Sequence, residues 1–562
     1  YPDGCLGDIM ELIETGFVLA DTYDNQNGFF PDGTICHHPR YGIQFTADAY
    51  GWEWLVENSI PMARFLKDTR YRAGDALYQT IADSLLDTYR SLTFKGYLDV
   101  AVGGLQPDRS KWGPRLLNAV TGLLEARSKD TTLLRETELQ AFRSILKNRD
   151  YVDDLTLDQP FWNIDCLVHR RPDYFASAKM ISTRSRGLER GIDRRSYYYL
   201  GDGALFVRTR ADAYNGLSER YNWHAIPGTT AEQRLDALPL AADSPFPGAN
   251  GTNAFAGVVS DGLFGFGAFV YERNHPDEAV NYSTVNGNKA YFFFENEILA
   301  LGNSIRRVRP GDGQDIWTTL NQDACRTDFV WSGPGDRAET IAWGTSGAER
   351  NFSFRDQPLW FYQDNLGYIV LPGSGEVRLS LQAPPKGKEV PLFQLAINHG
   401  VNPQDDRYQY VILPHARPED LEAYATRLAA GTPFTILRND SEVMAVYHHA
   451  LKITQAAFFQ PGQVTVTAGA EEFNLSVNRP ALVMLREVED RLEVTVTDPY
   501  QSTQDTTMVV GIGQNLSGPD CLYEESSGTS RLSFSHSAEA LYAGKPVTAM
   551  FHLNRSDWRK GP

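Results

Sequence analysis

The first part of the chain carries apolar residues at the three-to-four-residue spacing that is typical of amphipathic helices. Five stretches share this spacing: residues 5–23, 51–66, 74–94, 113–127 and 133–148. The joins between them are short and contain Gly, Pro or Asp. The pattern predicts an all-helical segment of about 170 residues, built from hairpins of antiparallel helices.

The pattern changes after Pro172. From Tyr197 onward, short apolar and aromatic runs alternate with Gly, Asn and Asp turns, which indicates antiparallel strands. Clear examples are ALFVRT, GAFVYE, AYFFFENEILALG, YIVLPG and VRLSLQA. Residues 417–429 keep a helical spacing. A last group of alternating runs lies at 464–468, 481–486, 492–497 and 506–511.

Together these patterns predict an α+β multidomain protein, because a chain of 562 residues is too long for one hydrophobic core. We expect a helical domain over residues 1–175. A central antiparallel β-sandwich domain should follow over residues 176–455. The last group of strands should form a small C-terminal β-sandwich domain over residues 456–562.

Composition limits the partners. The net charge of −18 and the pI near 5.1 argue against binding to nucleic acid. No apolar run reaches the roughly 18 residues of a membrane helix, so no membrane partner is expected. The five cysteines are scattered without zinc-type spacing, and their odd number leaves one thiol free or bonded outside the chain. Seven glycosylation sequons, all after residue 240, favour a secreted, extracellular glycoprotein.

Residues 28–54, GFFPDGTICHHPRYGIQFTADAYGWEW, carry the strongest candidate chemistry. His37 and His38 follow an Asp-Gly turn, and Tyr50 precedes the two indoles of Trp52 and Trp54. Imidazole and phenol are acid and base groups, and flat aromatic faces stack on sugar rings. The alternative is a buried His and Tyr beside ordinary core aromatics, and the local pattern by itself favours that alternative.

A second candidate is the arginine-rich stretch RSRGLERGIDRR at residues 184–195, where the helical and β patterns meet. It contains Arg184, Arg186 and Arg190, and His169-Arg170-Arg171 lies just upstream. In so acidic a chain, clustered arginines are candidates for an anion-binding wall. A solvated linker with its own ion pairs explains the stretch equally well.

Several stretches in order resemble polysaccharide lyase family 8, which contains hyaluronate, chondroitin AC and xanthan lyases. The resemblance covers essentially the whole chain. It implies an incomplete α/α toroid, then a large β-sandwich region and a small C-terminal sandwich, with a cleft near the arginine-rich junction. The stretches that carry it are GFFPDGTICHH…YG, FWNIDCLVHRRPDYFASAKMIS, YYYLGDGALFVR, NWHAIPGTT, FAGVVSDGLFGFGAFVY and AINHGVNPQDDRYQYVILP.

The resemblance implies cleavage of a uronic-acid-containing polysaccharide by β-elimination, without a cofactor. His38 and Tyr50 match the family's catalytic histidine and tyrosine, and Tyr41 is the fallback because the spacing between the first two is long. Asn222 and Arg109 are expected to contact the substrate carboxylate. The further substrate-binding candidates are His37, Trp52, Trp54, Gln106, Asn163, Arg184, Arg186, Arg190, Trp223 and His224; each tryptophan is as easily a core residue.

The chain departs from the family pattern in several places. Val102 and Gln106 stand where the family has two arginines, so Arg109 or a junction arginine would have to compensate. Asn222 replaces a family glutamate, and residues 248–257 lack the acids of a calcium loop, so no metal is expected there. The resemblance also implies helical residues ahead of Tyr1, including an asparagine that binds the uronate carboxylate. Either the chain is a piece of a cleaved precursor, or a companion segment or chain, to which Cys5 could be bonded, completes the toroid. The third alternative is that the carboxylate is neutralised differently, with Asn163 and Gln106 as candidates.

Two rival hypotheses stay open. A carbohydrate-binding relative that has lost catalysis would explain the replaced arginines. A glycoside hydrolase would need two carboxylates across a cleft, and the acids near residues 24–53 show no telling pair. The sequence does not identify the polymer, and the loss of the arginine pair leaves xanthan-like and other uronate polymers open beside glycosaminoglycans.

Overall fold

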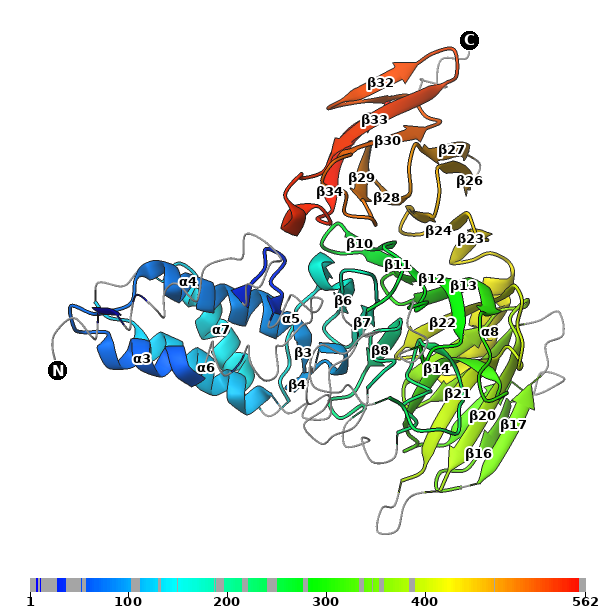
Figure 1. The fold of residues 1–562 in the computed structure, drawn as a ribbon, viewed down its shortest axis with the longest axis horizontal. Coiled ribbons are helices and arrows are strands. Elements are labelled where there is room, and N and C mark those ends of the chain that lie inside the picture. The colour runs from blue at the N-terminus through cyan, green and yellow to red at the C-terminus, as the bar shows by residue number, and fades with distance from the viewer. Residues whose placement is uncertain are drawn as a thin grey trace.

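The computed structural model describes most of the chain. The described residues are 7–8, 11, 28–36, 52, 57–102, 112–129, 133–148, 150–185, 187, 197–214, 221–239, 250–275, 281–332, 338–345, 347–352, 358–383, 390–469 and 471–554. A helical part near the N-terminus joins a large β part, and the C-terminal strands lie at the top of the view, above β10 and β11 (Figure 1). This order agrees with the predicted sequence of helical and β regions.

The helical part contains α3 (Ser59–Leu66), α4 (Asp75–Asp83), α6 (Gly113–Ala126) and α7 (Glu136–Lys147). A π-helical turn (Ser84–Tyr89) and α5 (Arg90–Leu92) continue α4. The apolar face of each helix packs into one core, as the helical spacing predicts. Residues 12–23 of the first predicted stretch lie outside the described residues, and Leu134 is 77% exposed ahead of α7.

A four-stranded antiparallel sheet follows earlier than predicted. Its order is β5 (Leu157–Phe161), β6 (Cys166–Arg170), β7 (Phe175–Lys179) and β8 (Ala204–Arg208). Two of these strands, β5 and β6, therefore occupy residues that the predicted helical segment included. β5 escaped prediction because it is an edge strand of sequence LDQPF, and such a strand tolerates Pro160 and needs little apolar alternation.

Two larger sheets form the central β part. The nine-stranded sheet has the order β10 (Ala256–Ser260), β11 (Gly265–Tyr271), β12 (Val285–Phe293), β13 (Ile298–Arg307), β22 (Asp406–Pro414), β19 (Leu366–Val370), β18 (Leu359–Gln363), β15 (Phe329–Ser332) and β16 (Ala338–Ile341). The five-stranded sheet has the order β17 (Ala348–Phe352), β20 (Glu376–Gln382), β21 (Leu392–Asn398), β14 (Ile316–Ala324) and β9 (Thr230–Glu232).

The nine-stranded sheet is buried on both faces. Along β12, Tyr291 and Phe293 pack into a core shared with the four- and five-stranded sheets. Ala290 and Phe292 point the other way, into a core shared with α8 (Pro418–Ala429) and the C-terminal strands. Alternate side chains of a strand face opposite sides, so a sheet covered on both sides reads as a continuous apolar run. This explains the run AYFFF.

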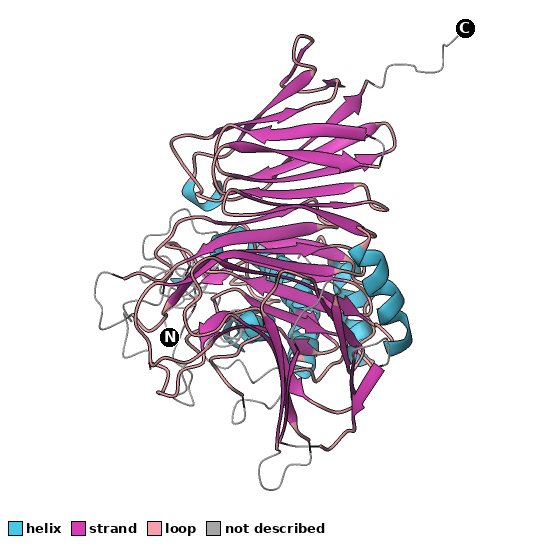
Figure 2. Cartoon of the chain, turned by 90° about the vertical axis from the view of Figure 1, so that its right-hand side faces the viewer, coloured by secondary structure: helices cyan, strands magenta, loops and turns pink. Residues whose placement is uncertain are grey.

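The C-terminal sandwich pairs two further sheets, which stack on the central part in layers (Figure 2). One sheet has the order β23 (Phe434–Asn439), β24 (Val443–His448), β25 (Ile453–Phe458), β28 (Ala481–Val488), β29 (Arg491–Thr497), β34 (Val547–Leu553) and β31 (Leu516–Ser517). The other has the order β26 (Gly462–Ala468), β27 (Glu471–Val477), β30 (Thr507–Ile512), β33 (Thr529–Ser535) and β32 (Cys521–Glu524). The first sheet begins at Phe434, so the boundary predicted at residue 455 falls within β25.

Three observations bear on the expected partners. Within the described ranges, no helix combines the length and apolarity needed to cross a membrane. In the same part of the chain, no cluster of three His, Cys, Asp or Glu side chains is placed to hold a metal ion. Cys166, Cys325 and Cys521 are free thiols, and Cys5 lies outside the described residues.

Candidate functional site at the junction of the helical and β parts

A small hairpin leads the chain toward the candidate histidines. Strands β1 (Gly28–Phe29) and β2 (Ile35–Cys36) are joined by the predicted Asp-Gly turn. One oxygen of Asp32 accepts the Thr34 N–H (3.0 Å), and the other accepts the N–H of Asn163 (2.8 Å). Burial raises the pKa of Asp32, and these two hydrogen bonds oppose that rise. The hairpin is thus fixed to the segment that precedes β6.

The turn is also fixed to the helices. Gly33 adopts φ = +84°, a conformation that favours glycine, and its carbonyl accepts the hydroxyl of Thr88 at 3.0 Å. A Cβ at Gly33 would lie 2.6 Å from that hydroxyl oxygen, so a side chain does not fit. The sequence signal Asp-Gly therefore marks a turn held between the helical part and the four-stranded sheet, directly before His37 and His38.

Much of the predicted catalytic set lies outside the described residues. This holds for His37, His38, Tyr50, Trp54, Gln106, Arg109, Arg186 and Arg190, and for the fallback Tyr41. The described residues that flank them in the sequence are Cys36, which precedes His37, and Val102 and Trp112 on either side of Gln106 and Arg109. Val100 and Ala101 pack in one apolar cluster with Tyr197, Tyr198 and Tyr199 of the β part, so the segment of Gln106 and Arg109 starts at the junction.

Trp52 lies in the helical core. Its side chain is 2% exposed, and its ring meets Tyr89 at 5.2 Å and Trp112 at 4.8 Å in edge-to-face contacts. A sugar platform needs an open aromatic face, which Trp52 does not offer. The structure places this tryptophan in the core role, the alternative that the sequence left open.

Asn222, Trp223 and His224 lie together on the β side of the junction, half-buried. The Asn222 Oδ1 accepts the N–H of His224 (3.1 Å), and its Nδ2 donates to Gln233 (3.1 Å). Trp223 packs edge-to-face on Tyr197 at 4.6 Å. The three predicted contacts are therefore neighbours, and Trp223 packs against the aromatic cluster that also contains Val100 and Ala101.

His224 heads a chain of hydrogen bonds. Its Nε2 lies 2.7 Å from the Tyr282 hydroxyl, and that hydroxyl donates to the Asp236 Oδ1 at 2.8 Å. Because Tyr282 gives its one proton to Asp236, it accepts from His224, which places the imidazole proton on Nε2. Burial lowers the pKa of His224, so the ring is neutral near pH 7. Arg234 ion-pairs with Asp236 at the end of the chain.

Buried arginines hold the junction. The Arg170 Nη1 donates to the carbonyls of Arg90 (3.0 Å), Ser91 (3.3 Å) and Thr93 (2.5 Å), at the C-terminal end of α5. A cation there adds a charged donor to carbonyls at the end of the helix, of which that of Arg90 also accepts the Thr93 N–H, and it complements the helix dipole. Burial lowers the pKa of Arg170 to about 10. On β8, the Arg208 Nη1 donates to the carbonyl of Leu98 at 2.9 Å.

The remaining predicted contacts are engaged within the protein. Arg184 ion-pairs with Asp165 at 3.0 Å and donates to the carbonyls of Ala254 and Ala256. Asn163 is 1% exposed, beneath the hairpin. The sequence left two explanations for the arginine-rich stretch, an anion-binding wall or a linker with its own ion pairs. Arg184 forms an ion pair within the protein, as the second explanation expects. A substrate role for Asn163 or Arg184 stays a prediction.

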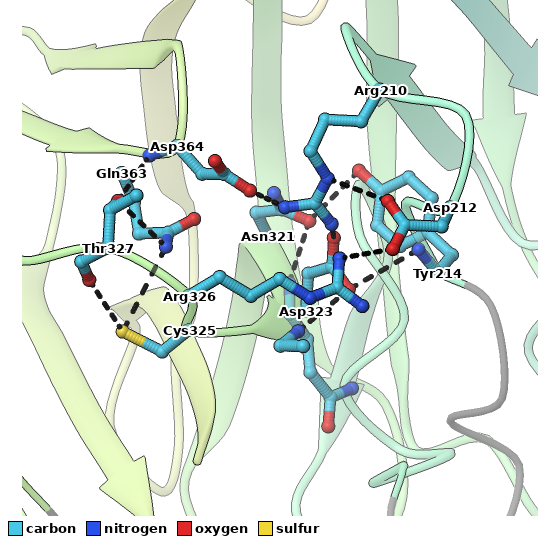
Figure 3. Close-up of polar contacts among 12 residues, drawn as sticks. Arg210, Asp212, Tyr214, Asn321, Asp323, Cys325, Arg326, Thr327, Gln363 and Asp364 are labelled. Carbon is cyan, nitrogen blue, oxygen red and sulfur yellow. Dashed lines mark hydrogen bonds and ion pairs between the residues drawn. The ribbon is translucent and has the colours of Figure 1, made fainter. Parts of the chain in front are cut away.

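A second charged cluster braces the chain that leads to Asn222 (Figure 3). Arg210, in the loop after β8, pairs with Asp212, with Asp323 of β14 and with Asp364 in the β18–β19 turn. The hydroxyl of Tyr214 donates to Asn321 at 3.1 Å. Asp323 lies 113 positions after Arg210, and Asn321 lies 107 positions after Tyr214, so no local sequence pattern predicts the cluster.

An open cavity that the sequence did not indicate begins at Asn222. It has a volume of about 540 Å³ and lies on the outer face of the five-stranded sheet. Its principal lining side chains are Asn222, Trp317, Glu349, Arg378, Ser380, Gln382 and Gln394. We call it the sheet-face groove.

Two family models match the chain in sequence. The super-sandwich domain of polysaccharide lyase family 8 matches residues 157–425. The C-terminal beta-sandwich domain of the same family matches residues 435–507. The two matched domains meet where the structure starts the seven-stranded sheet at Phe434, ahead of the predicted boundary.

Similar curated proteins are named as lyases. Chondroitinase-AC of Pedobacter heparinus is 29% identical over 495 residues, covering 84% of this chain and 64% of that protein. Hyaluronate lyase of Thermasporomyces composti is 25% identical, covering 84% and 63%. Xanthan lyase of Bacillus sp. GL1 is 23% identical, covering 86% and 54%. The chain thus spans less than two thirds of the length of these relatives.

Solved structures share the fold. A chondroitinase AC lyase, whose structure was determined with oligosaccharides, matches with a TM-score of 0.78 and 23% identity, covering 98% of this chain and 75% of that one. A Paenibacillus xanthan lyase matches with a TM-score of 0.79 and 18% identity, covering 98% and 54%. Both sequence domains and the fold agree: the chain belongs to polysaccharide lyase family 8.

Proposed function

We propose that this protein is a polysaccharide lyase that cleaves a uronic-acid-containing acidic polysaccharide by β-elimination and leaves a 4,5-unsaturated uronide end. The observation that carries the proposal is the match of both family domains, in order, over residues 157–425 and 435–507. The relatives named as chondroitinase, hyaluronate lyase and xanthan lyase share a substrate class, a polymer with uronate units. That class is the part of the substrate description we carry to this chain.

The chemistry requires three groups. The C5 proton of the uronate is weakly acidic, because the neighbouring carboxylate resists a second negative charge. Donors or cations must first neutralise that carboxylate, a base must take the proton, and an acid must protonate the leaving oxygen at C4. We assign both proton transfers to Tyr50, whose pKa a nearby cation would lower from about 10. His38 assists as base or holds the phenol.

The anchoring of the β1–β2 hairpin supports this assignment. Asp32 and Gly33 fix the turn to Asn163 and Thr88, so the chain leaves Cys36 at the junction, where the 103–111 segment also starts. Asn222 is the described residue that we place against the substrate carboxylate. Its Nδ2 gives one proton to Gln233 and has a second for a ligand. Arg109 is the proposed cation.

We propose that the described helices belong to an incomplete α/α toroid. A groove between α3 and α6 has a volume of about 580 Å³, and its lining residues are Ile60, Pro61, Arg64, Phe65, Asn118, Ala119 and Gly122. Phe65 is 78% exposed. A partly apolar helix face is more stable when another segment covers it, and we propose that a companion segment or chain does so. We also propose that the protein acts outside the cell, where its polymeric substrate would be met.

Ultraviolet absorbance tests the function. Hyaluronan, chondroitin and xanthan would each be mixed with the wild-type protein, and reducing ends would be counted in parallel. Elimination produces a C4–C5 double bond conjugated to the carboxylate, which absorbs, whereas hydrolysis produces none. We expect absorbance to rise with one or more polymers and to stay flat for Tyr50→Phe, with a strong loss for His38→Ala. Tyr41→Phe is the matched control and should keep the activity.

The same experiment separates the rival hypotheses. New reducing ends without absorbance would indicate a glycoside hydrolase and overturn the lyase assignment. Binding of a polymer without any new ends would indicate a carbohydrate-binding relative. Loss of activity in Tyr41→Phe, but not in Tyr50→Phe, would move the proton transfers to the fallback tyrosine.

A further inference from the structure

The sheet-face groove is built by strand alternation. Along β20, Val377, Leu379 and Leu381 point into the core, whereas Arg378 and Ser380 point outward into the groove. Its volume of about 540 Å³ falls in the range of small-ligand pockets, about 300–1,000 Å³. The groove begins at Asn222 and runs across β14, β21 and β20 toward β17, so it leads away from the junction along the β part.

A fixed arginine stands in the groove. The guanidinium of Arg378 lies over the ring of Trp317 at 4.9 Å, and its Nη2 donates to the Glu349 Oε2 at 3.3 Å. Ala396 on β21 is paired with Arg378 on one side and with Thr319 on the other, so no bulky side chain separates the arginine from the indole. The stacking holds the guanidinium plane while Nη1 has no hydrogen-bond partner among the described residues.

The floor of the groove is a network of side-chain amides. Gln382 donates to the Gln394 Oε1 (3.2 Å), and Gln394 donates to the Gln322 Oε1 (3.1 Å). The Asn222 backbone N–H donates to that same Gln322 oxygen at 2.8 Å. The network fixes the floor from Asn222 to the outer end of β20. The Trp317 Nε1 and the Arg378 Nε are buried without an acceptor in the described part of the chain.

The donors and acceptors point to the kind of ligand. Arg378 and Gln382 offer N–H donors, whereas Glu349 and the Gln382 carbonyl offer acceptors, and each sugar hydroxyl both donates and accepts. Glu349 offsets the charge of Arg378, which disfavours an isolated carboxylate or sulfate. We propose that the sheet-face groove is a subsite that binds an uncharged pyranose unit of the polysaccharide through its hydroxyl groups. This proposal rests on the proposed function only in taking the ligand to be that polymer.

Affinity measurements test the subsite separately from catalysis. Isothermal titration would measure binding of hyaluronan, chondroitin and xanthan to the Tyr50→Phe protein, so that cleavage does not interfere. Arg378→Met, which keeps an apolar stem on Trp317, would be added to that background. We expect it to weaken binding of at least one polymer about tenfold, the cost of a charge-assisted hydrogen bond. Arg350→Met, on an exposed arginine of β17 outside the groove, is the control and should bind normally.

Glu349→Gln determines the ligand class. It should weaken binding several-fold if the groove takes hydroxyls, because an acceptor is weakened. Tighter binding would mean that the groove takes an anion and would overturn the hydroxyl proposal. Unchanged affinity in Arg378→Met, or no binding of any of the three polymers, would overturn the subsite. If Arg378→Met weakens binding while the wild type yields no unsaturated ends, the subsite stands and the proposed lyase function fails.

Discussion

Arginines do different work at the junction and in the sheet-face groove. At the junction, Arg170 is fully buried, and three main-chain carbonyls of the helical part take its protons. In the groove, Arg378 is half-buried, stacked on an indole and bonded to one partly exposed carboxylate. A buried guanidinium that is bonded to main-chain carbonyls holds two parts together, whereas one that is fixed on a groove wall and partly exposed can take a ligand.

The largest effect should follow the loss of Arg170. Arg170→Met removes the donor for three carbonyls at the end of α5, and buried acceptors without partners are costly. We expect the free energy of unfolding to fall by about 3 kcal/mol, measured by chemical denaturation. Arg417→Met, on an exposed arginine, is the control and should leave the free energy of unfolding close to that of the wild type. Equal stability of the two variants would contradict a structural role for the junction arginine.

Removing the hairpin anchor should have a somewhat smaller effect. Asp32→Ala leaves the N–H groups of Thr34 and Asn163 without their acceptor, for an expected loss of about 2 kcal/mol. Activity should fall further than stability explains, because the hairpin leads to His38. Asp32→Asn keeps one acceptor oxygen and should lie between wild type and Asp32→Ala. Full activity in Asp32→Ala, at a temperature where it is folded, would show that the anchor does not position the site.

Two tryptophans sharpen the comparison. Trp52→Phe should lower the free energy of unfolding by about 1–2 kcal/mol and leave polymer affinity unchanged, because the indole is enclosed by Tyr89 and Trp112. Trp317→Phe should weaken polymer binding, because the smaller ring holds Arg378 less firmly, with little effect on stability. Titration calorimetry and denaturation of both variants check this. A reversed pattern would place the sugar contact in the helical part.

The smallest effect concerns pH. Burial lowers the folded-state pKa of His224 below its unfolded value of about 6.5, so the unfolded chain takes up the proton first. This residue therefore adds stability above pH 6.5, and that contribution is lost as the pH falls from about 6.5 toward the lower folded pKa. His224→Gln, whose amide can still donate to Tyr282, should lose less stability than wild type between pH 7.5 and pH 5.5. An identical loss would refute a buried, neutral His224.

Much of the architecture could be predicted because burial imprints a period on the sequence. The helical spacing of residues 113–127 and 417–429 became α6 and α8, and the run AYFFF became a strand covered on both faces. β5 could not be predicted in this way, because an edge strand with Pro160 carries almost no alternation. The boundary of the C-terminal sandwich was predicted too late because the sequences of β23, β24 and β25 are equally typical of strands in the central or the C-terminal domain.

In the candidate site, too, local features could be predicted from the sequence and features built from distant residues could not. The Asp-Gly turn before His37 is a local signal, and the structure confirms that turn. The roles of the junction arginines were harder to predict. The cluster in the sequence pointed to residues 184–195, whereas single arginines on β6 and β8 donate hydrogen bonds to the carbonyls of the helical part. The sheet-face groove could not be predicted from the sequence. Trp317, Glu349 and Arg378 come from three strands, and the strand order β17-β20-β21-β14 brings them together.

The mass of the new chain ends tests the central claim most directly. Oligosaccharides released from a uronate polymer would be analysed by mass spectrometry, with the wild-type protein beside Tyr50→Phe. Elimination yields products lighter by one water than hydrolysis products of the same length, because the C5 proton and the C4 oxygen leave without water being added. We predict the lighter products from the wild type and none from Tyr50→Phe. Products of hydrolytic mass would contradict the lyase assignment.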